Sequence, residues 1–269
     1  MPKVTVYLPT KNRVDLLKRA IESVFAQTET DWELIVVDDA STDSTSDYLA
    51  EVSAQDERVR VLVNDESRGS CHSRNRAVKL AKSKLVTGLD DDDEFLPQRL
   101  EILLNAYEPK YAFVSTSLYW VTHSGSRMIL DGEQILTRKS ELSRNHAGNQ
   151  ILVERERLLA VGGFDEAFPS LQDYDCFYRL VERFGPARRV NTPTMNIYVS
   201  HGFERISSGP KSTEGYEKFA EKHGYKMNWL QKLNHSTQRA IRQGRQRSPI
   251  VALKLVLLNV LITGRRSEH

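Results

Sequence analysis

Apolar positions in the N-terminal part of the chain follow two alternating spacings, which predict alternating strands and helices. Short Val-, Ile- and Leu-rich segments are typical of strands, and the intervening segments carry apolar residues three or four positions apart, as amphipathic helices do. The predicted strands span residues 3–9, 32–39, 58–64 and 84–90. The predicted helices span residues 14–27, 41–54, 73–83 and 97–108. This alternation indicates βαβ units, so we expect an α/β fold with a mostly parallel sheet flanked by helices.

The pattern after residue 110 predicts fewer regular elements. Residues 111–131 are typical of two strands joined by a short turn, and residues 188–202 of another strand. Residues 171–185 carry a wide apolar face at helical spacing, which predicts an amphipathic helix. Residues 132–150 are polar and give no clear prediction.

Polar and acidic residues follow each of the four predicted N-terminal strands. These segments are residues 9–13, 38–41, 64–70 and 90–95. In open α/β sheets, ligands bind outside the carboxyl ends of the strands. We therefore expect a ligand site at this edge.

Four consecutive aspartates, Asp90 to Asp93, stand at the end of the fourth strand. Mg²⁺ and Mn²⁺ prefer oxygen ligands, and Mg²⁺ is usually held by one or two carboxylates together with substrate phosphates. In an extended chain Asp90 and Asp92 face one way and Asp91 and Asp93 the other. The run therefore predicts a seat for Mn²⁺ or Mg²⁺ with a diphosphate. We interpret Asp93 and Glu94 as negative charge that precedes the next helix.

The C-terminal segment differs from the rest in charge. Residues 231–269 contain eight lysines and arginines and one acidic residue, so they carry +7, whereas the whole chain carries +2 and the remainder therefore −5. We predict a body over residues 1–227 and a basic, amphipathic helical extension over residues 228–269. Residues 250–262 are mostly apolar but too short to span a bilayer easily.

This extension fits an anionic membrane surface. A helix packed on the body with solvated charges is the alternative interpretation. Nucleic acid is not predicted as a partner, because the arginine-rich segment lacks interleaved aromatic residues. The two cysteines, Cys71 and Cys176, have neither metal-ligand spacing nor a disulfide framework, and no secretory leader is recognisable. We expect a cytoplasmic protein, peripheral at the inner face of the cytoplasmic membrane.

Five segments together resemble the family 2 glycosyltransferases. They are "VTVYLPTKNR", "SVFAQTETDWELIVVDDASTD", "RGSCHSRNRAVKLAKSKLVTGLDDDDEFLPQRL", "GGFDE" and "QDYDCFYRL", which occur in that family's order and spacing across residues 3–205. Each segment alone is a weak signal, but the ordered set is specific. The resemblance implies the GT-A fold of nucleotide-sugar transferases and inverting, metal-dependent sugar transfer.

The resemblance also implies residue roles on the nucleotide side. Pro9, Thr10, Asn12 and Arg13 would form the loop against the nucleotide, with Asn12 also a candidate helix cap. Asp39 would accept the uracil N3–H, and Arg74 would lie beside the base and its phosphates. Asp92 would bind the metal, and Asp90 or Asp91 the ribose or a metal-bound water. Asp91 replaces the small residue that usually separates the two acids.

On the acceptor side, the resemblance implies that Asp173 is the general base, with a simple helix cap as its alternative role. Asp175 would bind the acceptor or cap the helix, and Gly163 would bring the backbone close to the donor sugar. His201 would complete the metal site or grip the diphosphate, as would Arg205. Gln172 stands where the family often has glutamate.

We expect a UDP-sugar as donor and a cell-surface glycan or lipid-linked saccharide as acceptor. Two alternatives stay open at this point. A sugar-phosphate nucleotidyltransferase would need a loop rich in glycine and lysine after the first strand, whereas residues 9–13 have one lysine and no glycine. A non-catalytic nucleotide-sugar or membrane-binding module would not need every predicted catalytic carboxylate.

Overall fold

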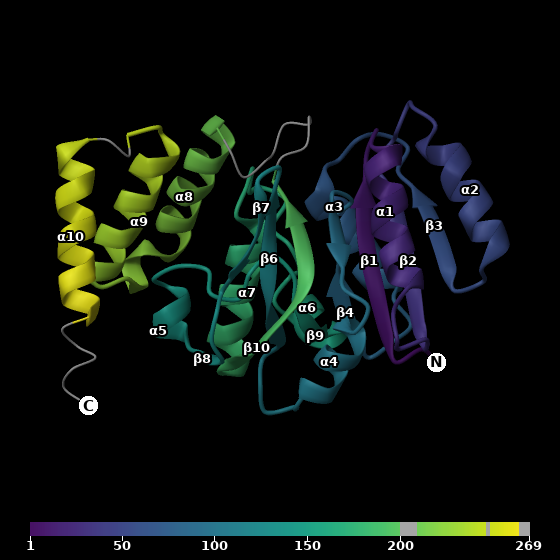
Figure 1. The fold of residues 1–269 in the computed structure, drawn as a ribbon, viewed down its shortest axis with the longest axis horizontal. Helices are drawn as coiled ribbons and strands as arrows, with labels where there is room; N and C mark the ends of the chain where they lie inside the picture. Colours follow the sequence, from purple (N-terminus) through teal and green to yellow (C-terminus); the bar gives the residue numbers. More distant parts are fainter. Residues whose placement is uncertain (200–208, 246–247, 264–269) are drawn as a thin grey trace.

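The computed structural model describes residues 1–199, 209–245 and 248–263. Within them, ten strands form one sheet with the order β3-β2-β1-β4-β9-β6-β10-β5, and β7 and β8 pair with β6 and β10. Helices cover both faces of this sheet, and a group of C-terminal helices stands at one end of the molecule (Figure 1). The predicted α/β class is confirmed.

The N-terminal half of the sheet is parallel, as predicted. Its strands are β1 (Val4–Thr10), β2 (Trp32–Asp38), β3 (Val59–Val63) and β4 (Leu85–Gly88). The connecting helices are α1 (Val14–Phe25), α2 (Thr45–Gln55) and α3 (Ser70–Leu80). β1 lies between β2 and β4, with Tyr7 beside Ile35 and Gly88. The carboxyl ends of these strands therefore meet at one edge.

The C-terminal half of the sheet is mixed. Its strands are β5 (Asp93–Phe95), β6 (Val114–Thr122), β7 (Gly125–Ile129), β8 (Gln134–Leu136), β9 (Leu152–Glu154) and β10 (Ala187–Tyr198). The accompanying helices are α4 (Arg99–Ala106), α5 (Arg138–Glu141), α6 (Arg155–Ala160) and α7 (Gln172–Phe184). β9 joins the two halves, since it runs antiparallel to both β4 and β6.

The core lies on both faces of the sheet because side chains alternate along each strand. On one face Val6 and Leu8 of β1 pack with Leu17 and Ile21 of α1. On the other face Tyr7 belongs to a cluster supplied by β2, α3 and α7. The central strands are thus buried on both sides, which explains their continuous apolar runs.

The C-terminal helices are α8 (Gly209–His223), the short 3₁₀ helix η1 (Gly224–Lys226), α9 (Trp229–Arg242) and α10 (Pro249–Thr263). The predicted boundary at residue 228 falls on Asn228, whose side chain caps α9 by accepting from the Gln231 amide at 3.0 Å. α8 precedes that boundary and packs on α9. Phe219 of α8 joins Tyr174 and Tyr178 of α7 in a third apolar cluster.

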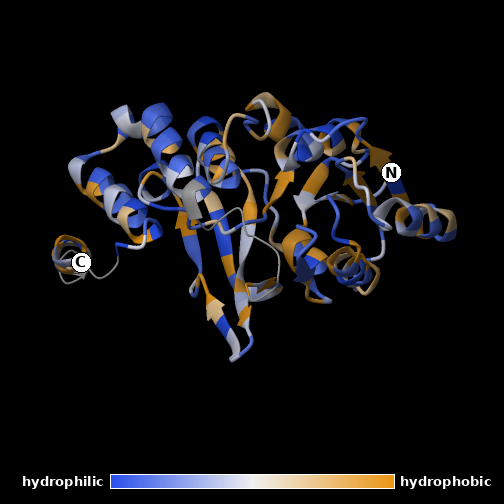
Figure 2. Ribbon diagram, turned by 90° about the horizontal axis from the view of Figure 1, so that it is seen from above, coloured by the Kyte–Doolittle hydropathy of each residue, from blue (hydrophilic) through white to orange (hydrophobic). Residues whose placement is uncertain are grey.

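The segment predicted as a helical extension contains two helices of different character. α9 is basic and packs on the body, whereas α10 is largely apolar and lies at the far end of the molecule (Figure 2). Ile250, Leu253 and Val256 of α10 are 66%, 61% and 58% exposed. Among the described residues, no helix combines the length and apolar character that crossing a membrane requires.

Candidate active site

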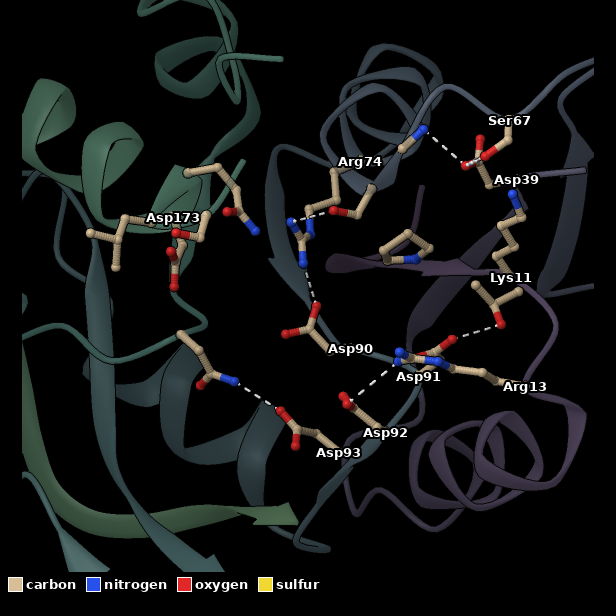
Figure 3. Close-up of a pocket in the computed structure, with 18 residues that line it drawn as sticks. Lys11, Arg13, Asp39, Ser67, Arg74, Asp90, Asp91, Asp92, Asp93 and Asp173 are labelled. Atoms are coloured by element: carbon tan, nitrogen blue, oxygen red, sulfur yellow. Dashed lines mark hydrogen bonds and ion pairs between the residues drawn. The ribbon is translucent and has the colours of Figure 1, made fainter. Parts of the chain in front are cut away.

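A cavity of about 450 Å³ opens at the carboxyl ends of β1, β2 and β4. The N-terminus of α7 forms its opposite wall (Figure 3). Nine of the predicted site residues line it: Pro9, Thr10, Arg13, Asp39, Arg74, Asp90, Asp91, Asp92 and Asp173. The parallel topology explains this convergence, because residues distant in sequence share the edge at which the strands end.

The loop after β1 is tied to the acidic run. Thr10 Oγ1 donates to Asp91 Oδ2 at 2.9 Å, and Arg13 Nη1 lies 3.1 Å from Asp91 Oδ1 and 3.5 Å from Asp92 Oδ2. Arg13 thus pairs with two aspartates of the acidic run at the cavity. Asn12 is not placed in this way.

Asn12 points to the neighbouring loop instead of the cavity. Its Oδ1 accepts from the Thr42 amide at 2.7 Å, and its own amide donates to Ser41 Oγ at 2.9 Å. The N-cap of α1 is Arg13, without a side-chain cap bond. Asn12 therefore neither caps α1 nor lines the cavity, and it braces the loop that carries Asp39.

Asp39 is buried and accepts four hydrogen bonds from the segment after β3. Its donors are Asn64 Nδ2, Ser67 Oγ and the amides of Arg68 and Gly69, at 2.7 to 2.9 Å. Burial opposes ionisation, but these donors outweigh it and hold the pKa of Asp39 below its usual value. A carboxylate has about four lone-pair sites. The Ser67 hydroxyl is the donor that can rotate away, so a ligand N–H could donate to Asp39 in its place.

The four aspartates are not equivalent. The chain turns after Asp90, whose carbonyl accepts from the Asp93 amide at 3.1 Å, so the run is not a simple extended strand. Exposure nevertheless alternates as expected: Asp90 and Asp92 are partly exposed, and Asp91 and Asp93 are buried. Burial raises the pKa of Asp91 to about 6, although Arg13 opposes this.

Asp93 and Glu94 are not charges before a helix, so that interpretation is wrong. Both lie in β5, and α4 begins only at Arg99. Asp93 lines the cavity and accepts from Asn149 Nδ2 at 2.8 Å. Glu94 accepts from Asn196 and Tyr198 of β10, at 2.8 and 2.7 Å.

Arg74 lies between the acidic run and Asp173 (Figure 3). Its Nη2 lies 2.6 Å from Asp90 Oδ1, and its side chain is 8% exposed. Asp173 follows the first residue of α7, whose N-cap is Leu171, so a simple cap role for Asp173 does not hold. Burial raises the pKa of Asp173 to about 6, while the charge of Arg74 opposes the shift. A carboxylate with this pKa can take up a proton near neutral pH.

The carboxylates fit a divalent cation that arrives with a diphosphate. The described part of the chain holds no group of three or more His, Cys, Asp or Glu side chains that could hold a metal by itself. Asp90 and Asp92 nevertheless offer oxygens to the cavity, and one or two carboxylates with substrate phosphates are the usual ligands of Mg²⁺. The residues therefore suit a metal shared with its substrate.

Two further predicted residues, besides Asn12, lie outside this cavity. Asp175 is fully buried and pairs with Arg179, Lys222 and His223, at 2.7, 3.1 and 2.8 Å. We therefore assign it to the packing of α8 on α7, not to the acceptor. Gly163 has φ +68°, and a Cβ there would lie 2.3 Å from Asn75 Oδ1. The backbone conformation and the contact with Asn75 thus account for glycine at this position without a ligand.

His201 and Arg205 lie outside the described residues. Four further residues at the site were not singled out from the sequence: Asn64, Ser67, Asn149 and Ser170. Asn64 and Ser67 belong to the polar segment 64–70 after the third strand, one of the segments at which the sequence predicts a ligand site. Asn149 lies in residues 132–150, whose polar pattern predicts no clear element.

A model of the family described as "Glycosyl transferase family 2" matches residues 5–184. The chain belongs to glycosyl transferase family 2. It is therefore a glycosyltransferase, as its resemblance to the family implied. This assignment also favours sugar transfer over the nucleotidyl transfer that the sequence left open.

Two relatives illustrate the family's range. The putative colanic acid biosynthesis glycosyl transferase WcaA of Escherichia coli K12 is 34% identical over 229 residues, which cover 82% of this chain and 81% of the relative. The GalNAc(5)-diNAcBac-PP-undecaprenol beta-1,3-glucosyltransferase of Campylobacter jejuni is 32% identical over 176 residues. That match covers 62% of this chain and 56% of the relative.

Solved structures share the fold. TarS 1–349 of S. aureus in complex with UDP-GlcNAc gives a TM-score of 0.66 at 19% identity, over 92% of this chain and 73% of that one. The mannosyltransferase PcManGT of Pyrobaculum calidifontis, in complex with GDP-Man and Mn²⁺, gives 0.57 at 18% identity, over 100% and 76%. The predicted GT-A fold is confirmed.

Proposed function

We propose that this glycosyltransferase moves a sugar from a UDP-sugar to an acceptor hydroxyl with inversion. The observation that carries the proposal is one cavity that holds Asp39 on one side, Asp173 on the other and the acidic run between them (Figure 3). A base reader, a diphosphate seat and a general base are the three parts that such a reaction needs.

Asp39 would read the base. A buried carboxylate that accepts a ring N–H discriminates against bases lacking that donor more sharply than apolar contact does. Ser67 would release Asp39 Oδ2 by rotating its hydroxyl, whereas the amides of Arg68 and Gly69 stay in place. The UDP-GlcNAc bound to TarS supports a uridine nucleotide, although PcManGT binds GDP-Man.

Asp92 with Asp90 would hold Mn²⁺ or Mg²⁺. A divalent cation there would neutralise charge on the leaving diphosphate. Arg13 and Arg74, which now pair with the acidic run, would turn toward the phosphates. Asp91, buried between Thr10 and Arg13, would hold that loop or the ribose.

Asp173 would remove the acceptor proton. The acceptor oxygen then forms its bond to the anomeric carbon as the bond to the diphosphate oxygen breaks, and the proton stays on the Asp173 carboxylate. UDP leaves with the bonding electron pair. Attack from the face opposite the diphosphate inverts the anomeric centre, so an α-linked donor gives a β-linked product.

The acceptor would be a bacterial cell-surface glycan or a lipid-linked saccharide, in keeping with the names of the two relatives. The exposed apolar residues of α10 and the basic residues of α9 would bring the enzyme to an anionic membrane surface, at the cytoplasmic face. Lys254 Nζ donates to Ser236 Oγ of α9 at 3.1 Å, which places one charge beside the apolar residues.

A panel of nucleotide sugars tests this proposal. With Mn²⁺ present, we expect hydrolysis of one UDP-sugar to release UDP, and UDP to bind about tenfold or more tighter than GDP. Equal or tighter binding of GDP, or turnover of GDP-sugars alone, would contradict the uridine assignment. Equal turnover with a chelator present would contradict the proposed dependence on a divalent metal.

A further inference from the structure

The C-terminal helices contact the part of α7 that carries Asp173. Tyr174 and Asp175 directly follow Asp173, and both are buried with their side chains turned toward α8 and α9. The family model matches residues 5–184, so α8 and α9 lie outside the segment that it matches.

The Asp175 carboxylate is the polar link between α7 and α8. It is fully buried, and its Oδ1 accepts from His223 Nε2 at 2.8 Å, where His223 is 3% exposed. Lys222 of α8 and Arg179 of α7 complete its partners. Burial opposes the charge, but His223 and the two cations outweigh it and hold the pKa of Asp175 below its usual value. The ionised carboxylate accepts only, so His223 Nε2 carries the proton.

Tyr174 is the apolar link. Its ring stacks on Phe219 of α8 with centroids 4.1 Å apart and an interplanar angle of 10°. The ring of His235 of α9 is nearly parallel to both of these rings, with its centroid 5.2 Å from that of Phe219 and 6.0 Å from that of Tyr174. Its Nε2 lies 3.2 Å from the Tyr174 hydroxyl. Both links are therefore rigid, buried contacts.

We propose that α8 and α9 position the Asp173 carboxylate, with His223 fixing Asp175 and the Phe219–His235 stack fixing Tyr174. The helices are then part of the catalytic machinery as well as a route to the membrane. His223 acts through Asp175 and is a positioning residue. The inference rests on Asp173 being the base, and it goes beyond that assignment because it concerns residues outside the family segment.

A small displacement of a reacting group can cost a large factor in rate, so the first turn of α7 is sensitive to its supports. The titratable groups around Asp173 are Arg74, Asp90, Tyr7, Cys71, Cys176 and Tyr216. Those around Asp175 are Arg179, Lys222, His223 and Asp165. His223→Leu changes none of the titratable groups around Asp173. Its effect on Asp173 therefore comes from a change in the position of that carboxylate.

The test compares His223→Leu with His223→Gln and with Lys226→Met. Gln can donate to Asp175 from nearly the same place as His Nε2. Lys226 also ties the C-terminal helices to α7, but through Glu182 at 2.7 Å, nine residues beyond Asp173 and about 13 Å along the helix. The readouts are kcat and KM for the UDP-sugar, the pH profile of kcat, UDP affinity and Tm.

We expect His223→Leu to lower kcat about tenfold with UDP affinity unchanged. The acidic limb of its kcat profile should move to lower pH, because a loosened Asp173 is better solvated. His223→Gln should restore most of kcat, and Lys226→Met should keep the wild-type profile. A His223→Leu enzyme with a lower Tm but wild-type kcat and pH profile would overturn the inference. If Asp173→Asn itself stays active, the proposed base is wrong instead, so the two failures are distinguishable.

Discussion

Arg74 Nη2 lies 2.6 Å from Asp90 Oδ1, and this partly buried ion pair lies on the side of the acidic run that faces Asp173 (Figure 3). Arg74 thus pairs with Asp90 and also acts on Asp173 through its charge. Its charge favours ionisation of Asp173, which burial opposes. The pair therefore lies between the proposed diphosphate site and Asp173, the carboxylate that would take the acceptor proton.

Replacing Arg74 by Met should raise the pKa of Asp173, because a cation that lowers it is removed. The acidic limb of the pH–kcat profile should then move to higher pH, and UDP should bind about tenfold or more weakly. Lys79→Met, an exposed cation on the same helix, is the control. An acidic limb that stays in place would show that Arg74 does not act on the base.

Asp91 should make the fold less stable as pH rises. Its pKa is about 6 in the folded protein, above the ordinary 3.8, so the folded state holds the proton more tightly than the unfolded state does. The resulting stability is present below about pH 4 and is lost as pH rises through 6. Between pH 4.5 and 7 the unfolding free energy of the wild type should fall by about 1–3 kcal/mol relative to Asp91→Asn.

Urea unfolding at several pH values measures this difference. Asp47→Asn, an exposed carboxylate of α2, is the control and should follow the wild type. If the unfolding free energies of the wild type and of Asp91→Asn change with pH in parallel, the raised pKa of Asp91 is refuted.

Asp92→Asn should uncouple UDP binding from Mn²⁺. In the wild type we expect Mn²⁺ to strengthen UDP binding about tenfold or more, because the cation bridges the carboxylates and the diphosphate. Calorimetric titration of the enzyme with UDP, once in the presence of Mn²⁺ and once in the presence of a chelator, measures the coupling. Glu94→Gln, which changes a carboxylate bonded to Asn196 and Tyr198, should keep it. Undiminished coupling in Asp92→Asn would remove Asp92 from the metal site.

The exposed face of α10 should decide membrane binding. Ile250→Ser, Leu253→Ser and Val256→Ser together change only exposed positions and should leave Tm nearly unaltered. We expect the triple variant to lose partitioning onto phosphatidylglycerol-containing vesicles. Wild-type binding should weaken with added salt and with purely phosphatidylcholine vesicles. Unchanged partitioning of the triple variant would contradict the role of α10.

The N-terminal half of the fold and the edge of the site could be predicted because local signals decide them. Strand and helix periods are visible in residues 3–108, and ligand residues follow the ends of parallel strands. The acidic run was misread at Asp93 and Glu94 because the sequence does not reveal that β10 pairs with them. Pairing between strands so far apart in the chain is a tertiary property.

The same holds for Asn149 and for α8. Asn149 reaches the cavity because the segment before β9 returns to β4, which no local pattern in residues 132–150 reveals. The sequence predicts that Asp175 binds the acceptor or caps the helix, because no local pattern places α8, which supplies His223, beside α7. These residues owe their roles to packing partners, not to their neighbours in sequence.

Asp173→Asn is the most direct test of the proposed reaction. The measurement is the rate of UDP release from the best donor of the nucleotide-sugar panel, together with UDP affinity in the presence of Mn²⁺. Glu166→Gln, an exposed carboxylate near α7, is the control and should behave as the wild type. We expect nearly unchanged UDP affinity and a turnover lowered about 10²-fold or more, because no general base remains to take the acceptor proton. An Asp173→Asn enzyme that releases UDP at the wild-type rate would contradict it.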